Sequence, residues 1–86
     1  MNGVGIEGRV ILITGANRGI GKALTRKALE LGAKKVYATA RDESKLADVK
    51  ALGSERVVTL ALDVTNQNQI SAAAQAASDV EIVINN

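Results

Sequence analysis

The chain has 86 residues and a formal net charge of +2, and 47% of its residues are hydrophobic. A chain of this length forms one domain, residues 1–86, and the absence of cysteine and histidine excludes disulfides, thiolate catalysis and histidine-based metal sites. The basic residues are scattered and no apolar run approaches the ~20 residues that span a membrane, so neither a nucleic acid nor a membrane is an expected partner.

The chain begins with a predicted strand over Arg9–Thr14. Its consecutive apolar residues Val-Ile-Leu-Ile are typical of a parallel strand that is covered on both faces. A helix is predicted over Gly19–Leu31, and Gly32 is its left-handed stop. The apolar residues of this helix recur at helical spacing and predict one buried stripe, made of Ile20, Ala23, Leu24, Ala28 and Leu31.

A second strand and a second helix follow in the same pattern. The strand is predicted over Lys35–Ala40, and the helix over Glu43–Leu52 with Gly53 as its terminator. A third β-branched run predicts a strand over Arg56–Leu62. Strand and helix therefore alternate without a linker or a repeat between them.

The last part of the chain adds a helix and a strand. Asn66, followed three places later by Gln69, has the spacing of a capping box and predicts a helix start. The apolar stripe of that helix consists of Ile70, Ala73, Ala74 and Ala77. A fourth strand is predicted over Val80–Ile84.

This β-α-β-α-β-α-β series predicts an α/β fold with a doubly wound parallel sheet. Right-handed crossovers make the strand order 3-2-1-4 the economical arrangement. In that order the first two helices cover one face of the sheet and the third covers the other, so one face is short of cover. The crevice between the first and fourth strands is where such folds bind ligands.

A glycine-rich loop, Thr14-Gly15-Ala16-Asn17-Arg18-Gly19-Ile20-Gly21, joins the first strand to the first helix. Such a loop presents unpaired backbone N–H groups and the positive end of a helix dipole to an anion. The spacing excludes a P-loop, and Asn17 stands where the strict G-x-G-x-x-G fingerprint needs its second glycine. A glycine-rich loop that is only a structural turn is the alternative.

With Thr14 before it, the spacing G-x-x-x-G-x-G resembles the cofactor loop of the short-chain dehydrogenase/reductase family. The resemblance implies a Rossmann-like fold in which the first glycine permits the tight turn. It also implies that the later two allow the backbone to approach a pyrophosphate and the helix to pack against the sheet. The cofactor-binding residues implied on this loop are Gly15, Asn17, Arg18, Gly19, Ile20 and Gly21.

Arg41 lies just after the second strand, at the adenosine end of the predicted crevice. Family members that prefer NAD usually place an acid at the end of this strand, and Ala40 stands at the matching position. A guanidinium suits a phosphate, so Arg41, with Arg18 from the loop, favours NADP(H) over NAD(H). Two alternatives stay open: Arg41 is an ordinary exposed arginine, or Asp42, which could also cap the second helix, holds the ribose.

Two further segments carry the family resemblance. Asp63-Val64, after the third strand, resembles the family's Asp-Val pair beside the adenine ring, where a carboxylate accepts from the exocyclic amine and a backbone N–H donates to a ring nitrogen. Asn85-Asn86 resembles the start of the family's Asn-Asn-Ala-Gly motif, which implies that these residues steady the sheet and border the cofactor ribose.

No catalytic residue is predicted in this chain. The family's serine and Tyr-x-x-x-Lys pair lie beyond its Asn-Asn motif. The single tyrosine, Tyr37, is followed four places later by Arg41 rather than lysine, and its place in a strand predicts a core residue. Hydride transfer also needs a proton donor and a wall for the nicotinamide. We therefore expect this chain alone not to be an enzyme.

Two functions remain open. The first is an isolated dinucleotide-binding half of a short-chain dehydrogenase/reductase that binds NADP(H) weakly. The second is a remnant or engineered fragment that folds as a homodimer and binds no cofactor measurably. Self-association is expected through residues 80–85, where Val80, Ile82 and Ile84 are predicted on an unprotected strand edge. The N-terminal stretch Met1–Gly5 lacks the apolar region of a signal peptide, so the expected location is cytoplasmic.

Overall fold

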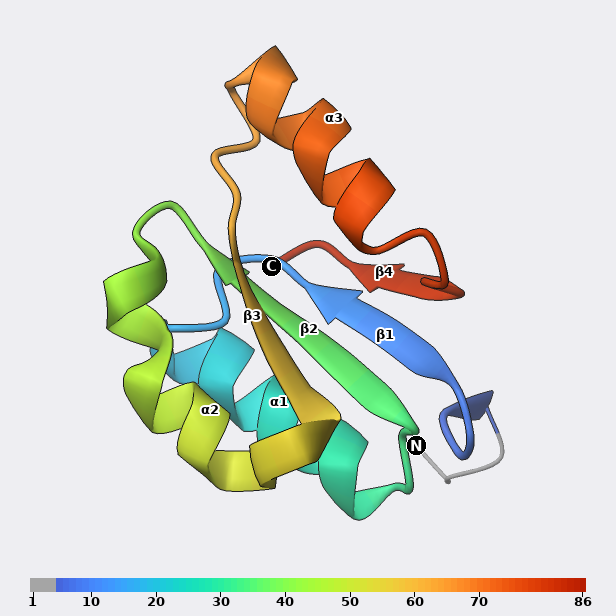
Figure 1. Ribbon diagram of the computed structural model, residues 1–86. Coiled ribbons are helices and arrows are strands. Elements are labelled where there is room, and N and C mark those ends of the chain that lie inside the picture. Colours follow the sequence, from blue (N-terminus) through green and yellow to red (C-terminus); the bar gives the residue numbers. More distant parts are fainter. Residues whose placement is uncertain (1–4) are drawn as a thin grey trace.

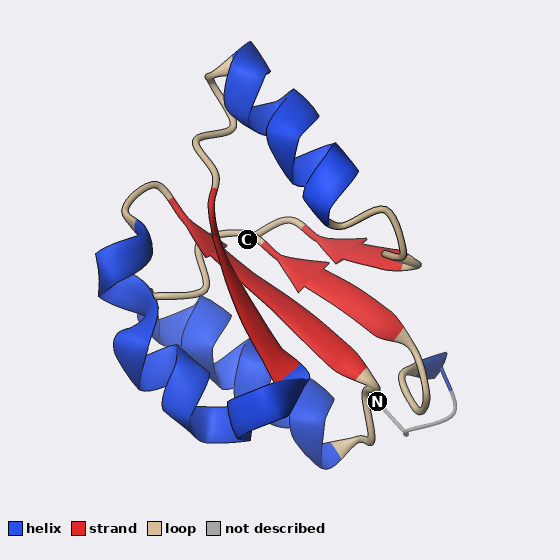
Figure 2. Ribbon diagram, viewed as in Figure 1, coloured by secondary structure: helices blue, strands red, loops and turns tan. Residues whose placement is uncertain are grey.

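The computed structural model describes residues 5–86. Residues 1–4, most of the stretch examined above for a signal peptide, therefore lie outside the described residues. Within residues 5–86 four parallel strands lie side by side in the order β3-β2-β1-β4, with helices on both sides (Figures 1 and 2). The elements are β1 (Val10–Ile13), α1 (Gly19–Glu30), β2 (Lys35–Ala40), the short 3-10 helix η2 (Glu43–Leu46), α2 (Ala47–Gly53), a second 3-10 helix η3 (Ser54–Arg56), β3 (Val57–Ala61), α3 (Gln67–Ala76) and β4 (Ile82–Ile84).

The predicted α/β fold and its strand order are confirmed. Helices α1 and α2 lie on one face of the sheet and α3 lies on the other (Figure 1). The larger core cluster lies under α1 and α2, and it includes the fully buried Ile11, Ile13 and Val36. A smaller cluster of Val10, Leu12, Tyr37 and Ala77 lies on the α3 side, so the face under α3 has the thinner cover.

Helix α1 buries part of the predicted stripe: Ala28 is in the core and Leu24 and Leu31 pack against it, whereas Ile20 and Ala23 are exposed. It ends as expected, because Gly32 adopts a φ of +88°. The buried residues of the helix are Gly21, Thr25 and Ala28, and Ile20 is 70% exposed. Each residue turns the helix by about 100°, so placing Gly21 against the loop before the helix turns the neighbouring Ile20 toward solvent.

The second helix ends at Gly53, as predicted, but without the left-handed turn that ends α1 at Gly32. Residues 43–46 form η2, and Gly53 is the last residue of α2 without a positive φ. A Cβ at this position would lie 2.7 Å from Leu29 Cδ1 and 2.7 Å from Val57 Cγ2. A side chain at residue 53 would have to displace Leu29 and Val57, because α2 packs closely on α1 and β3, which are segments far apart in the sequence.

The predicted start of α3 is confirmed in part. The Asn66 side chain caps the helix by accepting a 3.2 Å hydrogen bond from the Gln69 backbone N–H. Gln69, however, does not complete the capping box, because its Oε1 accepts from the backbone N–H of Asp63 at 2.7 Å. The backbone N–H of Asn66 instead donates to the Asp63 carbonyl. Gln69 thereby ties α3 to the loop that follows β3.

Strand β4 is shorter than predicted, and its exposed apolar residue is a different one. It begins at Ile82, because the Glu81 side chain accepts from the Val10 N–H and pairs with Arg9 at 2.9 Å. Ile82 and Ile84 pack against the core under α1 and α2. Val83 points to the opposite face, because side chains alternate along a strand, and it is 62% exposed.

Tyr37 is a core residue, as predicted, with 5% of its surface exposed. Its hydroxyl donates to Asp79 Oδ1 at 2.6 Å, and Lys35 Nζ lies 2.7 Å from Asp79 Oδ2. The hydrogen bonds from Lys35 and Tyr37 hold the pKa of the Asp79 carboxyl below its usual range, and Asp79 in turn raises the pKa of Lys35. This polar cluster fastens the segment between α3 and β4 to the start of β2.

No helix within residues 5–86 is long and apolar enough to cross a membrane.

Candidate functional site

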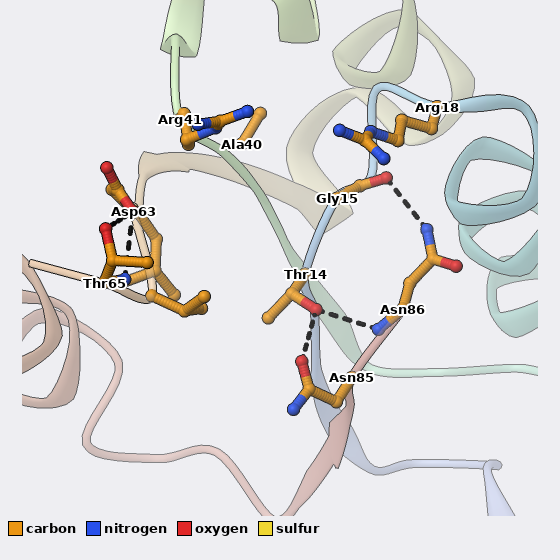
Figure 3. A pocket seen from close by; sticks show the side chains of 11 residues that line it. Thr14, Gly15, Arg18, Ala40, Arg41, Asp63, Thr65, Asn85 and Asn86 are labelled. Atoms are coloured by element: carbon orange, nitrogen blue, oxygen red, sulfur yellow. Dashed lines mark hydrogen bonds between the residues drawn. The ribbon is translucent and has the colours of Figure 1, made fainter.

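A pocket of about 230 Å³ lies at the carboxyl ends of the strands (Figure 3). This is the edge of a parallel sheet at which doubly wound folds bind ligands. Residues from the glycine loop, the end of β2, the segment after β3 and the segment after β4 line it: Thr14, Gly15, Arg18, Ala40, Arg41, Leu62, Asp63, Val64, Thr65, Asn85 and Asn86.

The glycine loop needs two of its glycines for its own geometry. Gly15 has a φ of +59°, which places it in the left-handed region that favours glycine. A Cβ on Gly21 would lie 2.1 Å from the Gly15 carbonyl oxygen, so the start of α1 can approach the loop only with glycine at this position. Next to Gly19, in contrast, there is open space for a Cβ.

The N-terminus of α1 opens beside this pocket without a side-chain cap. Arg18 is the N-cap residue, and it forms no capping hydrogen bond with its side chain. Asp42 and Asn66, by comparison, cap η2 and α3. The first N–H groups of a helix have no partner within the helix, so those of α1 are available to an anion.

Thr14 joins the end of β1 to the segment after β4. Its hydroxyl donates to Asn85 Oδ1 and accepts from the Asn86 backbone N–H, both at 2.9 Å. The Asn86 side chain then donates to the Gly15 carbonyl oxygen at 3.1 Å, so the amide rests against the loop (Figure 3). Both asparagines are therefore held beside the glycine loop through Thr14.

Two arginines from different elements line the same pocket. Arg18 comes from the loop and Arg41 from the end of β2, and they lie toward the same end of the pocket in Figure 3, near Ala40. Ala40 is almost wholly buried, with 4% of its surface exposed. Asp42 caps η2, because its carboxylate accepts from both the backbone N–H and the hydroxyl of Ser44. The capping role left open for Asp42 is thus the one observed.

Asp63 lies on the same side of the pocket as Arg41 (Figure 3). Its Oδ1 accepts from the Thr65 backbone N–H at 2.9 Å and from the Thr65 hydroxyl at 2.6 Å. These hydrogen bonds, with the charge of Arg41 as a smaller contribution, hold the pKa of the Asp63 carboxyl below its usual range. The carboxylate is ionised at neutral pH and is fixed at the pocket wall as an acceptor.

The structure brings most of the predicted site residues together. Seven of them line the pocket: Gly15, Arg18, Arg41, Asp63, Val64, Asn85 and Asn86. The other four lie on the loop or on the first turn of α1, outside the lining: Asn17, Gly19, Ile20 and Gly21. Leu62 and Thr65 were not predicted as site residues. The spacing Asp-x-Thr is typical of a side-chain turn and could have identified Thr65.

A parallel sheet of order β3-β2-β1-β4, with a glycine-rich loop at the carboxyl end of β1, defines a Rossmann-type dinucleotide-binding fold. The family model described as short chain dehydrogenase matches residues 9–86. The chain belongs to this family.

Individual relatives agree with this assignment. The chain is 41% identical over 85 residues to the 3-oxoacyl-acyl-carrier-protein reductase FabG of Vibrio cholerae, and it covers 34% of that protein. A short chain dehydrogenase from Burkholderia cenocepacia, solved in complex with NADP, matches all of this chain at 44% identity and a TM-score of 0.85. A Brucella melitensis 3-ketoacyl-(acyl-carrier-protein) reductase complexed with NADH matches 91% of it at 28% identity and a TM-score of 0.74. The chain spans about a third of the length of such relatives, 34% of FabG and 33% of the Burkholderia protein.

Proposed function

We propose that this chain is the dinucleotide-binding part of a short-chain dehydrogenase/reductase and that it binds NADP(H) in preference to NAD(H). The observation that carries the preference is a pair of arginines: Arg41 follows β2 and Arg18 comes from the glycine loop, and both line the pocket with the buried Ala40. A 2′-phosphate at this position meets two guanidinium groups and no carboxylate at residue 40, whereas a ribose hydroxyl finds no acceptor on Ala40.

The remaining pocket residues fit the rest of a dinucleotide. The uncapped N–H groups at the start of α1 suit the pyrophosphate, because the helix dipole favours an anion there. The ionised Asp63 and the backbone of Val64 suit the edge of an adenine ring. Asn85 and Asn86, held by Thr14, border the space for a ribose.

The preference for NADP(H) rests on this chain's own residues. The Burkholderia neighbour is solved with NADP and the Brucella neighbour with NADH, so the shared fold is compatible with either cofactor. The positive charge of Arg41 favours a phosphate over a hydroxyl at the adenosine ribose, and Ala40 offers no carboxylate to repel that phosphate. This charge pattern is the basis of the proposal.

We further propose that the chain by itself holds the dinucleotide without transferring a hydride. Its single tyrosine is buried near the start of β2, and the Tyr37 hydroxyl is engaged by Asp79 and Lys35. A general acid must reach the reacting carbonyl with a free proton, and Tyr37 is not placed to do so.

Titration of the chain with NADPH and with NADH, followed by the fluorescence of the reduced nicotinamide, tests the proposed function. We expect NADPH to saturate the chain at a roughly tenfold lower concentration than NADH, since hydrogen bonds to a charged group contribute about 1.5–3 kcal/mol each before screening at an exposed site. Equal affinity, or tighter binding of NADH, would contradict the preference, and a flat response to both would contradict the binding function.

The second candidate function, a self-associating fragment, is favoured by the exposed apolar surface beside β4. Val83 is 62% exposed, and together with Leu12, Ile70 and Ala73 it lines an apolar cavity of about 290 Å³ on the α3 face. Edge strands and apolar patches of this kind attract a second chain. We expect light scattering at micromolar concentration to give the mass of a dimer, and Val83→Lys to lower it to that of a monomer. An unmodified chain that is monomeric under these conditions would refute self-association.

A further inference from the structure

Thr39, near the end of β2, is wholly buried and makes two hydrogen bonds to the chain around the glycine loop. Its hydroxyl donates to the Ile13 carbonyl oxygen at 3.0 Å. Its backbone carbonyl accepts from the Ala16 N–H at 2.9 Å. Ile13 and Ala16 stand on either side of Thr14–Gly15, so one residue of β2 holds the loop both before and after its tight turn.

Hydrogen bonds to two neighbouring strands hold the peptide unit between Ile13 and Thr14. Thr39 holds its carbonyl from β2, while the Thr14 N–H donates to the Ile84 carbonyl of β4 at 3.1 Å. Because a peptide unit is planar, fixing its oxygen and its hydrogen fixes the direction in which the chain leaves β1. The Gly15 turn starts from that direction, and α1 follows the turn.

Ala40, the next residue of β2, forms a backbone hydrogen bond to the other side of the pocket. Carbonyl groups alternate in direction along a strand, so the Ala40 carbonyl points away from β1 and accepts from the Leu62 N–H at 2.8 Å. Leu62 precedes Asp63 at the pocket wall. The end of β2 thus joins the glycine loop on one side to the segment that carries Asp63 on the other.

We propose that Thr39 is a positioning residue for the dinucleotide site, and that its hydroxyl sets the affinity of the glycine loop for the pyrophosphate common to NADP(H) and NAD(H). The inference rests on the proposed dinucleotide-binding function. Thr39 has no exposed surface, so it acts through the loop and not by touching a ligand. It is distinct from Arg41, which acts on the phosphate that only NADP(H) carries.

The matched substitutions are Thr39→Val, which keeps the shape and removes the hydroxyl, and Thr39→Ser, which keeps the hydroxyl. In titrations of the full chain we expect Thr39→Val to weaken binding of NADPH and NADH by the same factor, roughly three- to tenfold, because a buried hydrogen bond is lost. Thr39→Ser is expected to restore binding. Thr59→Val on β3, where the hydroxyl makes only a long 3.4 Å contact with Glu43, is the control for a threonine-to-valine change and is expected to bind like the unmodified chain.

A readout without cofactor separates this inference from the proposed function. In the free chain, we expect Thr39→Val to speed hydrogen exchange of the Ala16 amide more than that of the Ala38 amide, and Thr39→Ser to leave both nearly unchanged. If the unmodified chain binds neither dinucleotide, the proposed function fails and the exchange result alone decides the role of Thr39. Unchanged exchange at Ala16, unchanged affinity in Thr39→Val, a loss confined to NADPH, or equal losses in Thr39→Val and Thr39→Ser would each overturn the inference.

Discussion

Replacing Gly21 with alanine is expected to destabilise the chain by about 3 kcal/mol and to abolish dinucleotide binding. The added Cβ would lie 2.1 Å from the Gly15 carbonyl oxygen, which belongs to the backbone and cannot rotate away. Alanine in a helix normally gains about 0.5–1 kcal/mol over glycine, so the overlap must overcome that gain before it costs stability. Separating α1 from the loop relieves the overlap, and this movement removes the anion-binding geometry. Urea unfolding and NADPH titration measure the two effects.

Gly19→Ala is the matched control, two residues earlier in the same helix. A Cβ at Gly19 meets open space, and its φ is not in the left-handed region. We expect this variant to be as stable as the unmodified chain or slightly more stable. We also expect it to lose affinity for NADPH, because the family resemblance implies that the backbone at Gly19 approaches the pyrophosphate. The comparison separates a glycine needed for packing from one needed for access to the ligand. Equal stability of the Gly21 and Gly19 variants would show that the close approach to Gly15 is not required.

Much of the fold follows from local sequence pattern. The bounds of β1, α1, β2 and β3 agree with prediction to within one residue at each end, because apolar runs and helical periodicity are local signals. The errors arise where distant segments meet. Gly53 ends α2 as predicted but also packs against Leu29 and Val57, and Gln69 reaches back to Asp63 instead of to its own helix start. Neither partner can be identified from the neighbouring residues alone.

Most of the residues that line the candidate site could be predicted from the sequence, whereas the residues that hold them in place could not. The main residues of the site were predicted because the loop, Arg41, Asp63 and the two asparagines each follow a strand, and parallel strands bring their carboxyl ends to one edge. The groups that hold those residues in place could not be predicted. Thr14 reaches Asn85 and Asn86 across 71 and 72 positions of the chain, and Thr39 reaches Ile13 across 26. Such contacts depend on the register between strands.

The residue pair at the end of β2 is expected to determine which dinucleotide binds. Arg41→Ala should weaken NADPH binding roughly tenfold or more and leave NADH binding nearly unchanged, because only NADPH offers a phosphate to the guanidinium group. Adding Ala40→Asp to this variant should reverse the preference. The new carboxylate repels a 2′-phosphate and accepts from the ribose hydroxyls of NADH, so we expect the ratio of the two affinities to change by roughly a hundredfold or more. Paired titrations with NADPH and NADH measure the ratio.

Ala40→Asn in the Arg41→Ala background separates charge from size at this position. Ala40 is 4% exposed and packs in the core under α1 and α2, so a larger side chain disturbs the end of β2 whether or not it is charged. The asparagine has nearly the same volume as aspartate but does not repel a phosphate. If charge determines the preference, the asparagine variant should bind both dinucleotides with similar affinity and only the aspartate variant should favour NADH. Equal behaviour of the two variants would assign the effect to packing, and an unchanged preference in all of them would place the 2′-phosphate away from Arg41.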